Sequence, residues 1–158
     1  SQMEAIDTLI NNVGVGRYAP FEELTAEDWD QALSVNVAGT AAVIRAILGY
    51  MRGAGGGHII NVGSIRITES GANWSAYAAS KFGLDALTKT LRLELDGTGI
   101  IVAQIYPGGV LTHFGDIDPA AKDQSWMSPE AIAQAIAMMV EFRGAAWLRD
   151  VSIMPDPT

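Results

Sequence analysis

The segment Ser75-Ala-Tyr-Ala-Ala-Ser-Lys81 begins a helical pattern that lies between two short apolar segments, and this arrangement decides the predicted fold. The pattern continues through regularly spaced leucines to Leu95 and ends at Gly97, a residue type that is common after helices. Segments 58–62 and 100–106 are short, apolar and rich in β-branched residues, which is typical of buried strands. We therefore predict a strand–helix–strand unit in which the two strands are parallel.

The rest of the chain continues this alternation. Segments 6–10 and 151–155 also have the composition of buried strands. A helix is expected to begin at Thr25, a capping residue followed by acidic residues, with a helical pattern from position 29 to about 51. Another is expected from Ser128 to about Phe142. Strands that alternate with helices form a parallel sheet covered on both faces, so we predict an α/β fold with three layers, α/β/α.

Composition limits the class of protein. The 158 residues are 49% hydrophobic and 18% charged, which indicates a globular chain. The formal net charge of −8 argues against nucleic-acid partners and anionic membranes. Without cysteine the chain has no disulfides, and its two histidines are too far apart in sequence to suggest a metal site. Because no uninterrupted apolar run could span a bilayer and no secretory signal is evident, we expect a cytoplasmic protein with no membrane partner.

The glycine-rich segment 53–57 resembles a phosphate-binding loop only superficially. It lacks the Gly-Lys-Ser/Thr ending of such loops, and it precedes a predicted strand, whereas phosphate-binding loops follow one. We interpret it as a helix stop and a flexible connection.

Tyr77 and Lys81 are four residues apart on the predicted helix, so their side chains share one face. A phenol loses its proton near ~10 and an ammonium near ~10.4. A neighbouring positive charge favours the phenolate, so we expect Lys81 to lower the pKa of Tyr77. The pair alone is weak evidence, because the same spacing also occurs in helices that carry a solvated lysine.

Further polar residues follow the predicted strands. In a parallel sheet, ligands bind beyond the carboxyl ends of the strands, where Ser64 and the Pro107-Gly108 pair are expected. Ser64 is suited to hold a carbonyl or alkoxide oxygen, while Tyr77 gives or takes its proton. Asn36, from the preceding helix, is expected to fix a backbone or water link to Lys81. These residues together predict a proton-relay site.

The ordered set Asn11-Asn12-Val13-Gly14, Asn36, Ser64, Tyr77 with Lys81, and Pro107-Gly108 with Thr112 resembles the short-chain dehydrogenase/reductase family along essentially the whole chain. The resemblance implies hydride transfer between NAD or NADP and a small alcohol or carbonyl substrate. It implies that the catalytic residues are Asn36, Ser64, Tyr77 and Lys81. The residues that the resemblance places at the cofactor are Asn11, Val13, Gly14, Tyr77, Lys81, Pro107, Gly108, Val110 and Thr112.

One family element has no counterpart in the sequence. The family begins with a strand, a Thr-Gly-x-x-x-Gly-x-Gly turn and a helix that holds the pyrophosphate, and nothing before Ile6 matches it. The resemblance therefore implies one domain, residues 1–158, that is a partial Rossmann-like, doubly wound sheet. It contains the last four strands with their helices, and we expect the N-terminal βαβαβ part to be absent.

Two alternative functions follow if the chain cannot bind the dinucleotide. Ser64, activated by Tyr77 and Lys81, could act in ester hydrolysis, although the sequence lacks the Gly-x-Ser-x-Gly elbow. The chain could instead be a non-catalytic assembly unit. Family members usually form dimers or tetramers through the two long helices, so we also expect a homodimer or homotetramer through helices 29–51 and 75–96.

The segment from Thr112 to Trp126 is polar and irregular, and the resemblance identifies it as the variable substrate loop. We expect Trp74 and Trp126 to form walls of the substrate pocket. His113 is a less favoured candidate for a substrate contact, and His58 is expected to be structural or solvated.

Overall fold

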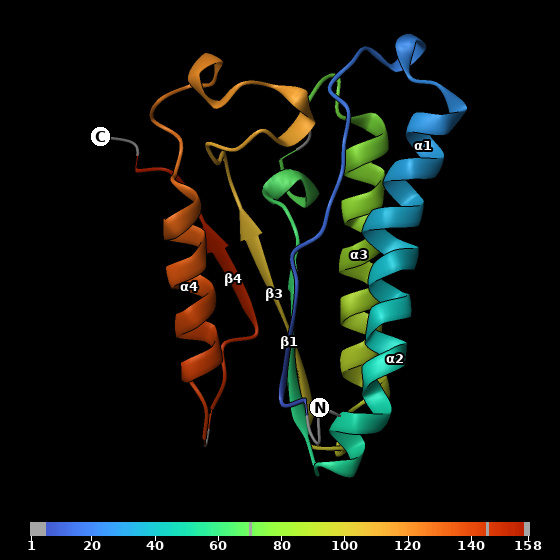
Figure 1. The fold of residues 1–158 in the computed structure, drawn as a ribbon, viewed down its shortest axis with the longest axis vertical. Coiled ribbons are helices and arrows are strands. Elements are labelled where there is room, and N and C mark those ends of the chain that lie inside the picture. Colours follow the sequence, from blue (N-terminus) through green and yellow to red (C-terminus); the bar gives the residue numbers. More distant parts are fainter. Residues whose placement is uncertain (1–5, 70, 145, 157–158) are drawn as a thin grey trace, which may run out of the picture.

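Four strands form one parallel sheet in the order β1-β2-β3-β4 (Figure 1). The computed structural model describes residues 6–69, 71–144 and 146–156. Strand bounds differ from the expected ones by two residues or fewer: β1 is Thr8–Asn11, β2 Gly57–Val62, β3 Ile100–Pro107 and β4 Asp150–Ile153. The predicted parallel sheet is therefore confirmed.

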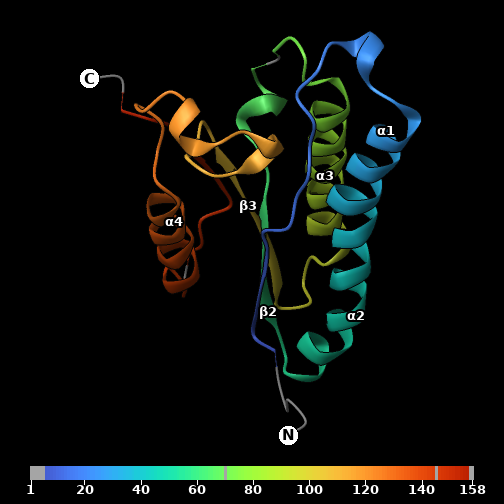
Figure 2. The ribbon, with the colours of Figure 1, turned by 45° about the horizontal axis from the view of Figure 1, so that its top comes forward.

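Helices cover both faces of this sheet, which confirms the three predicted layers. On one face lie α1, Ala26–Leu33, α2, Thr40–Gly53, and α3, Ser75–Glu94; on the other lies α4, Pro129–Glu141 (Figures 1 and 2). A separate apolar core fills each interface. Alternate residues of one strand supply both cores, since Ile59 of β2 belongs to the core with α2 and Ile60 to the core with α4.

The helix expected from Thr25 begins there through a reciprocal cap. The Thr25 hydroxyl accepts a hydrogen bond from the backbone N–H of Asp28, and the Asp28 carboxylate accepts one from the backbone N–H of Thr25, at 3.2 and 2.8 Å. This arrangement satisfies two backbone groups that a helix start leaves open. The helix is not regular throughout, because a π-helical turn, Ser34–Gly39, separates α1 from α2.

The π-helical turn is important for the candidate site because it contains Asn36. The wider turn inserts residues relative to an α-helix, and such turns occur frequently at functional sites. Here the Asn36 side chain is fully buried between the helix and the segment after β1. The sequence predicted the helix but not this irregularity.

The glycine-rich segment 53–57 lies at the amino end of β2, because it connects the end of α2 to that strand. It is therefore on the opposite edge of the sheet from the carboxyl ends of the strands. Gly55 has a φ of 81°, a conformation that glycine adopts without strain. The segment ends a helix and turns the chain, as predicted.

His58, at the start of β2, is buried rather than solvated, with a relative exposure of 1%. Neither ring nitrogen has a hydrogen-bond partner among the described residues. Burial, together with the positive charge of Arg143, lowers the pKa of His58 to about 4. The folded protein therefore holds this imidazole neutral where an unfolded chain would protonate it.

We expect the buried His58 to lower the free energy of unfolding as the pH falls. Its pKa is about 4 in the folded protein against 6.5 ordinarily, so its contribution is complete above pH 6.5 and is lost as the pH falls towards 4. Urea unfolding between pH 7 and 4.5 should show a weaker pH dependence for His58→Leu than for the wild type. His113→Leu, at an exposed position, is the matched control and should keep the wild-type dependence. Equal pH dependence of the wild type and His58→Leu would contradict this assignment.

Candidate active site

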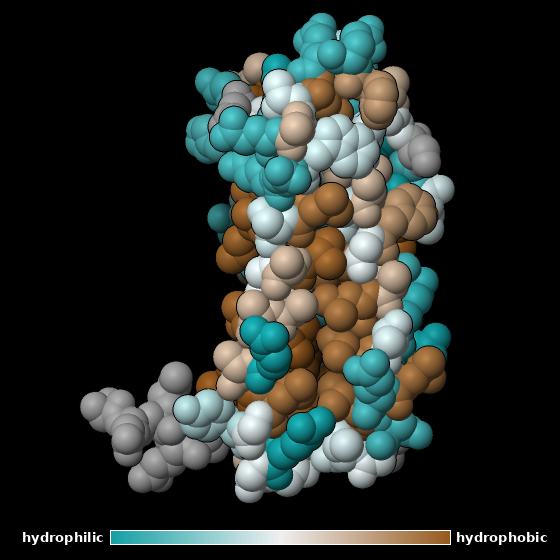
Figure 3. Space-filling model, turned by 90° about the vertical axis from the view of Figure 1, so that its right-hand side faces the viewer, coloured by the Kyte–Doolittle hydropathy of each residue, from teal (hydrophilic) through white to brown (hydrophobic). Residues whose placement is uncertain are grey.

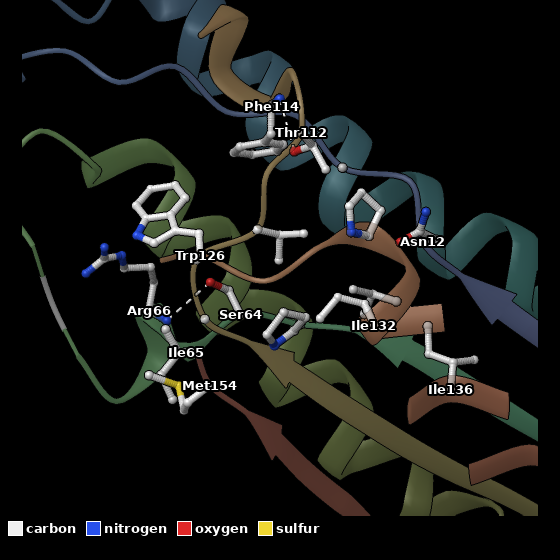
Figure 4. A pocket seen from close by; sticks show the side chains of 18 of the residues that line it. Asn12, Ser64, Ile65, Arg66, Thr112, Phe114, Trp126, Ile132, Ile136 and Met154 are labelled. Carbon is white, nitrogen blue, oxygen red and sulfur yellow. Dashed lines mark hydrogen bonds between the residues drawn. The ribbon is translucent and has the colours of Figure 1, made fainter. Parts of the chain in front are cut away.

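A cavity of about 850 Å³ lies at the carboxyl ends of the strands, the edge that the sequence predicted. Its walls come from the segments after β1, β2 and β3, from the start of α3, and from α4 (Figure 4). Ser64, Tyr77 and Lys81 all line it. Three of the four expected catalytic residues therefore line one cavity. Asn36 is not among the lining residues and is described below.

Tyr77 is held by aromatic neighbours near the first turn of α3. Its ring centroid is 5.3 Å from that of Trp74 and 5.1 Å from that of Phe114. Burial raises the pKa of Tyr77 above its ordinary value, while the Ser64 hydroxyl and the positive charge of Arg66 act in the opposite direction. Burial dominates, so the phenol is protonated at neutral pH.

Lys81 lies one turn after Tyr77 and is not a solvated lysine, since its relative exposure is 4%. Its ammonium donates a hydrogen bond to the backbone oxygen of Val62 at 2.9 Å and lies 5.8 Å from the centroid of the Tyr77 ring. Burial lowers the pKa of Lys81 to about 8. The pKa of Tyr77 is thus raised where the sequence predicted it to be lowered, because desolvation of the phenol outweighs the lowering effects of the Ser64 hydroxyl and the Arg66 charge.

Asn36 joins the segment after β1 to α3 by side-chain hydrogen bonds. Its side-chain amide donates to the backbone oxygen of Val15 and accepts from the backbone N–H of the same residue, both at 2.8 Å. It also donates to the hydroxyl of Ser80 at 2.8 Å. The link to Lys81 was expected to run through backbone or water, and among the described residues no hydrogen bond joins the two side chains directly. Both side chains instead lie against Gly14, where an added Cβ would be 3.3 Å from the Lys81 ammonium and 3.4 Å from the Asn36 oxygen.

Ser64 ends the turn after β2 and caps a short 3-10 helix. Its hydroxyl oxygen accepts a hydrogen bond from the backbone N–H of Arg66 at 3.2 Å (Figure 4). Its relative exposure is 6%. The cap fixes the hydroxyl at the cavity wall, beside the Tyr77 phenol whose pKa it acts to lower.

The residues expected at the cofactor divide into two groups. Gly14, Pro107, Gly108, Val110 and Thr112, with Tyr77 and Lys81, line the cavity. Asn11 and Val13 are not among its lining residues. Asn11 instead donates a side-chain hydrogen bond to Asn61 at 2.8 Å, which joins β1 to β2, and Val13 is 73% exposed. For Asn11, the structure supports a role in the fold.

The cavity has features that suit a flat ring such as nicotinamide. Gly14 brings the backbone close to the Lys81 ammonium, which has only one acceptor among the described residues, the Val62 oxygen. Gly109 lies directly against the Trp126 ring, where any side chain would collide. The residues expected at the nicotinamide end of a dinucleotide are thus chemically compatible with that group. The sequence offers no Thr-Gly-x-x-x-Gly-x-Gly turn for the pyrophosphate.

The expected substrate loop contributes Thr112, Phe114, Lys122 and Trp126 to the cavity. Trp74 and Trp126 both line it, as predicted, whereas His113 is exposed and is not among the lining residues. The sequence interpretation missed several lining residues. They are Arg66, Phe114, Lys122, Ile132, Ile136 and Met154. Arg66 could have been suspected, because it follows Ser64 by only two residues. The residues from α4 could not, because their place depends on packing between distant segments.

The family model for short chain dehydrogenases matches residues 1–122. Among curated proteins, the D-threitol dehydrogenase of Mycolicibacterium smegmatis is 44% identical over 110 residues, which are 70% of this chain and 42% of that protein. The sepiapterin reductase of Chlorobaculum tepidum is 34% identical over 132 residues, 83% of this chain and 54% of that protein. The chain thus spans about half the length of these curated relatives.

Solved structures agree with this relationship. The closed form of serine dehydrogenase complexed with NADP+ superposes with a TM-score of 0.84 at 28% identity, covering 94% of this chain and 63% of that one. The resemblance found in the sequence motifs, the parallel sheet with its helices, and the match of the family model all lead to the same conclusion. The chain belongs to the short chain dehydrogenase family.

Proposed function

We propose that the protein is an NAD(P)(H)-dependent oxidoreductase that interconverts an alcohol and a ketone or aldehyde. The observation that carries this proposal is the joint burial of Tyr77 and Lys81 on one face of α3, beside Ser64, in a cavity at the strand ends. Dehydrogenases and a reductase are among the relatives, and one structural neighbour is complexed with NADP+. Because these proteins are longer than this chain, the activity of the whole protein is the part that needs testing.

In the proposed mechanism, Ser64 donates a hydrogen bond to the carbonyl oxygen of the substrate and fixes its position. The nicotinamide, when bound, supplies or accepts the hydride. In reduction, the phenol of Tyr77 donates its proton to the same oxygen, and in oxidation the phenolate takes it back. The raised pKa of Tyr77 supports its role as the acid in reduction, because the phenol retains its proton at neutral pH. Lys81 stabilises the phenolate that results.

The residues proposed to hold the nicotinamide end of NAD or NADP are those that line the cavity around Gly14, Pro107, Gly108, Val110 and Thr112. Lys81 is proposed to donate a hydrogen bond to the adjacent ribose. Val13 and Asn11 were expected at the cofactor as well, and they remain predictions. The choice between NAD and NADP depends on the adenine ribose, for which these residues offer no contact.

Titration with NADH and with NADPH, following nicotinamide fluorescence on protein of verified mass, tests the proposal. Saturable enhancement that is lost in Lys81→Met is expected, because the ammonium is proposed to hold the ribose. Lys89→Met is the matched control, since Lys89 lies on the same helix, is not among the residues that line the cavity and forms an ion pair with Asp85 at 2.7 Å. Absence of saturable binding of either cofactor would contradict the proposal for this chain.

The ester-hydrolase alternative makes a distinct prediction. If Ser64 is a nucleophile, turnover of an activated ester such as 4-nitrophenyl acetate must disappear in Ser64→Ala. Ester turnover that survives this substitution removes the alternative. We favour the oxidoreductase, because the Ser64 oxygen is engaged by the backbone of Arg66 and no histidine lines the cavity among the described residues.

We also propose that the protein forms a homodimer or homotetramer through α1–α3. The outer face of these helices carries a hydrophobic band (Figure 3). Large apolar side chains of α2 and α3 are strongly exposed, among them Tyr50 at 55% and Leu93 at 81%. Exposed apolar patches of this kind mark interaction surfaces. The same surface would serve the non-catalytic assembly alternative, so assembly does not separate the two functions.

Leu93→Glu combined with Tyr50→Glu is expected to shift the protein to a monomer, because charged side chains would have to be desolvated in the interface. Light scattering coupled to size-exclusion chromatography measures the mass. Glu94→Gln is the control and should leave the mass unchanged. A wild-type protein that is a stable monomer would contradict the assembly proposal.

The continuous helical stretch Ala26–Gly53 is long and apolar enough to cross a membrane by length and composition. The sequence expectation considered only uninterrupted apolar runs, and this stretch contains Arg45. One such helix is weak evidence for a membrane span, because core helices meet the same criterion. Ile44 and Met51 of α2 are buried against the sheet, so we keep the cytoplasm as the proposed compartment.

A further inference from the structure

Two cationic side chains besides Lys81 line the cavity, and no ion pair among the described residues includes either of them. Arg66 lines it two residues after Ser64, with its guanidinium carbon 5.8 Å from the centroid of the Trp74 ring. Its side chain donates one long hydrogen bond, 3.4 Å, to the backbone oxygen of Glu69. None of the ion pairs among the described residues involves Arg66. Most of its five N–H donors are therefore available to a ligand.

Lys122, from the substrate loop, is the second cation. Its ammonium lies 5.8 Å from the centroid of the Trp126 ring and donates a hydrogen bond to the backbone oxygen of Phe114 at 3.0 Å. Partial desolvation lowers the pKa of Lys122 below its ordinary value. Among the ion pairs of the described residues, none includes it.

Aromatic rings lie beside both cations, and the lining of the cavity also includes the carboxylates Glu69 and Glu141. Trp74, Phe114 and Trp126 form the walls beside them, and Glu69 is the lining carboxylate nearest to Arg66 in sequence. Aromatic faces attract a cation but do not neutralise it. Cations held at a largely apolar cavity are stabilised when an anion arrives, because the attraction between opposite charges is stronger where water is partly excluded. The cavity that contains Tyr77 and Ser64 thus also offers a place for one negative charge.

We propose that the substrate is an alcohol or ketone that carries a carboxylate, which Arg66 and Lys122 bind while the reacting oxygen lies at Ser64 and Tyr77. This inference rests on the proposed function and names its substrate class, a hydroxy acid and the corresponding keto acid. Arg66 provides a planar pair of donors that matches a carboxylate, and Lys122 provides a point charge. Because the guanidinium packs against Trp74 and Gly71, we place the carboxylate several bonds from the reacting oxygen.

Binding of keto acids tests the proposal without any need for cofactor or turnover. The probes are 4-oxopentanoate and 6-oxoheptanoate, each compared with its methyl ester, which has the same ketone but no charge. The fluorescence of Trp74 and Trp126, which line the cavity, reports binding. We expect at least one acid to bind about tenfold more tightly than its ester, since hydrogen bonds to charged groups are stronger than neutral ones.

Substitutions test whether Arg66 and Lys122 bind the carboxylate. Arg66→Gln and Lys122→Gln should each reduce the affinity for the acid towards that of its ester and leave the ester unchanged. Arg45→Gln, at an exposed position on α2, is the matched control and should behave as the wild type. Equal affinity for acid and ester, failure of every acid to bind saturably, or an acid preference that survives both substitutions would each overturn the proposal.

Turnover separates this inference from the proposed function. The second measurement is oxidation of NADH or NADPH by each probe. If the keto esters are reduced as fast as the keto acids, the oxidoreductase is supported and the carboxylate site is overturned. Acid-selective binding that depends on Arg66 and Lys122, without turnover of any probe, would support the site and count against the oxidoreductase.

Discussion

Tyr77→Phe is expected to reduce kcat for carbonyl reduction by about 10²- to 10⁴-fold, the usual contribution of a positioned acid. The substitution removes only the phenol oxygen, so the proton donor is lost while the ring remains. The ring contacts with Trp74 and Phe114, at 5.3 and 5.1 Å, do not need that oxygen. The midpoint of thermal unfolding should therefore change little. Steady-state oxidation of NADH or NADPH with a carbonyl substrate measures kcat, and circular dichroism follows unfolding.

Tyr18→Phe is the matched control for this experiment. Tyr18 packs against the same tryptophan, with ring centroids 5.1 Å apart, but it is 49% exposed and is not among the residues that line the cavity. Its substitution should leave kcat within about twofold of the wild type, as for a surface change outside the reacting groups. If Tyr77→Phe retained wild-type kcat, Tyr77 would not be the acid, and the proposed mechanism would be wrong.

Asn36→Ala is expected to lower the free energy of unfolding by about 3 kcal/mol. The substitution removes the amide that satisfies both the N–H and the oxygen of Val15, and it also removes the donor to the Ser80 hydroxyl. Asn36 is fully buried, so water cannot easily replace these bonds. Each buried polar group left without a partner costs about 1–3 kcal/mol. Urea denaturation at neutral pH measures the change.

Activity provides a second measurement for the same variant. Asn36 holds the segment after β1, which includes Gly14 beside the Lys81 ammonium, so its loss should also weaken cofactor binding. Ser34→Ala is the control, because Ser34 lies in the same π-helical turn but is exposed and bonds only to the backbone oxygen of Gln31. Its effect should stay within about 0.5 kcal/mol. A change below 1 kcal/mol for Asn36→Ala would show that its hydrogen bonds are not structural.

The fold could be predicted from the sequence because its signals are local. Each strand is a short β-branched segment, and each helix has an apolar stripe. The helices α1 and α4 also begin at the capping residues Thr25 and Ser128, both of which accept the expected backbone hydrogen bonds. Strand ends shifted by one or two residues, since pairing with neighbouring strands decides where a strand begins and ends. The π-helical turn at Asn36 was not predictable, because its stabilising bonds join residues 21 positions apart.

The candidate site was predicted in part. Ser64, Tyr77 and Lys81 share one cavity, which the rule that ligands bind at strand ends anticipated. The electrostatics were not anticipated. Lys81 was expected to lower the pKa of Tyr77, but helical spacing says nothing about how much water a phenol loses on folding. The partner of Asn11 was not predicted either, since Asn61 becomes adjacent only when β1 pairs with β2.

The sequence by itself determined the family, the order of strands and helices, and the identity of the residues that lie at the strand ends. These properties follow from spacing along the chain, which periodicity and motifs record. Tertiary structure alone decided that burial keeps the Tyr77 phenol protonated, that Asn36 fastens the segment of Val15, and that Arg66 and Lys122 line the cavity outside every ion pair of the described residues. Each of these depends on which atoms exclude water from a group, and that is fixed by packing between segments distant in sequence.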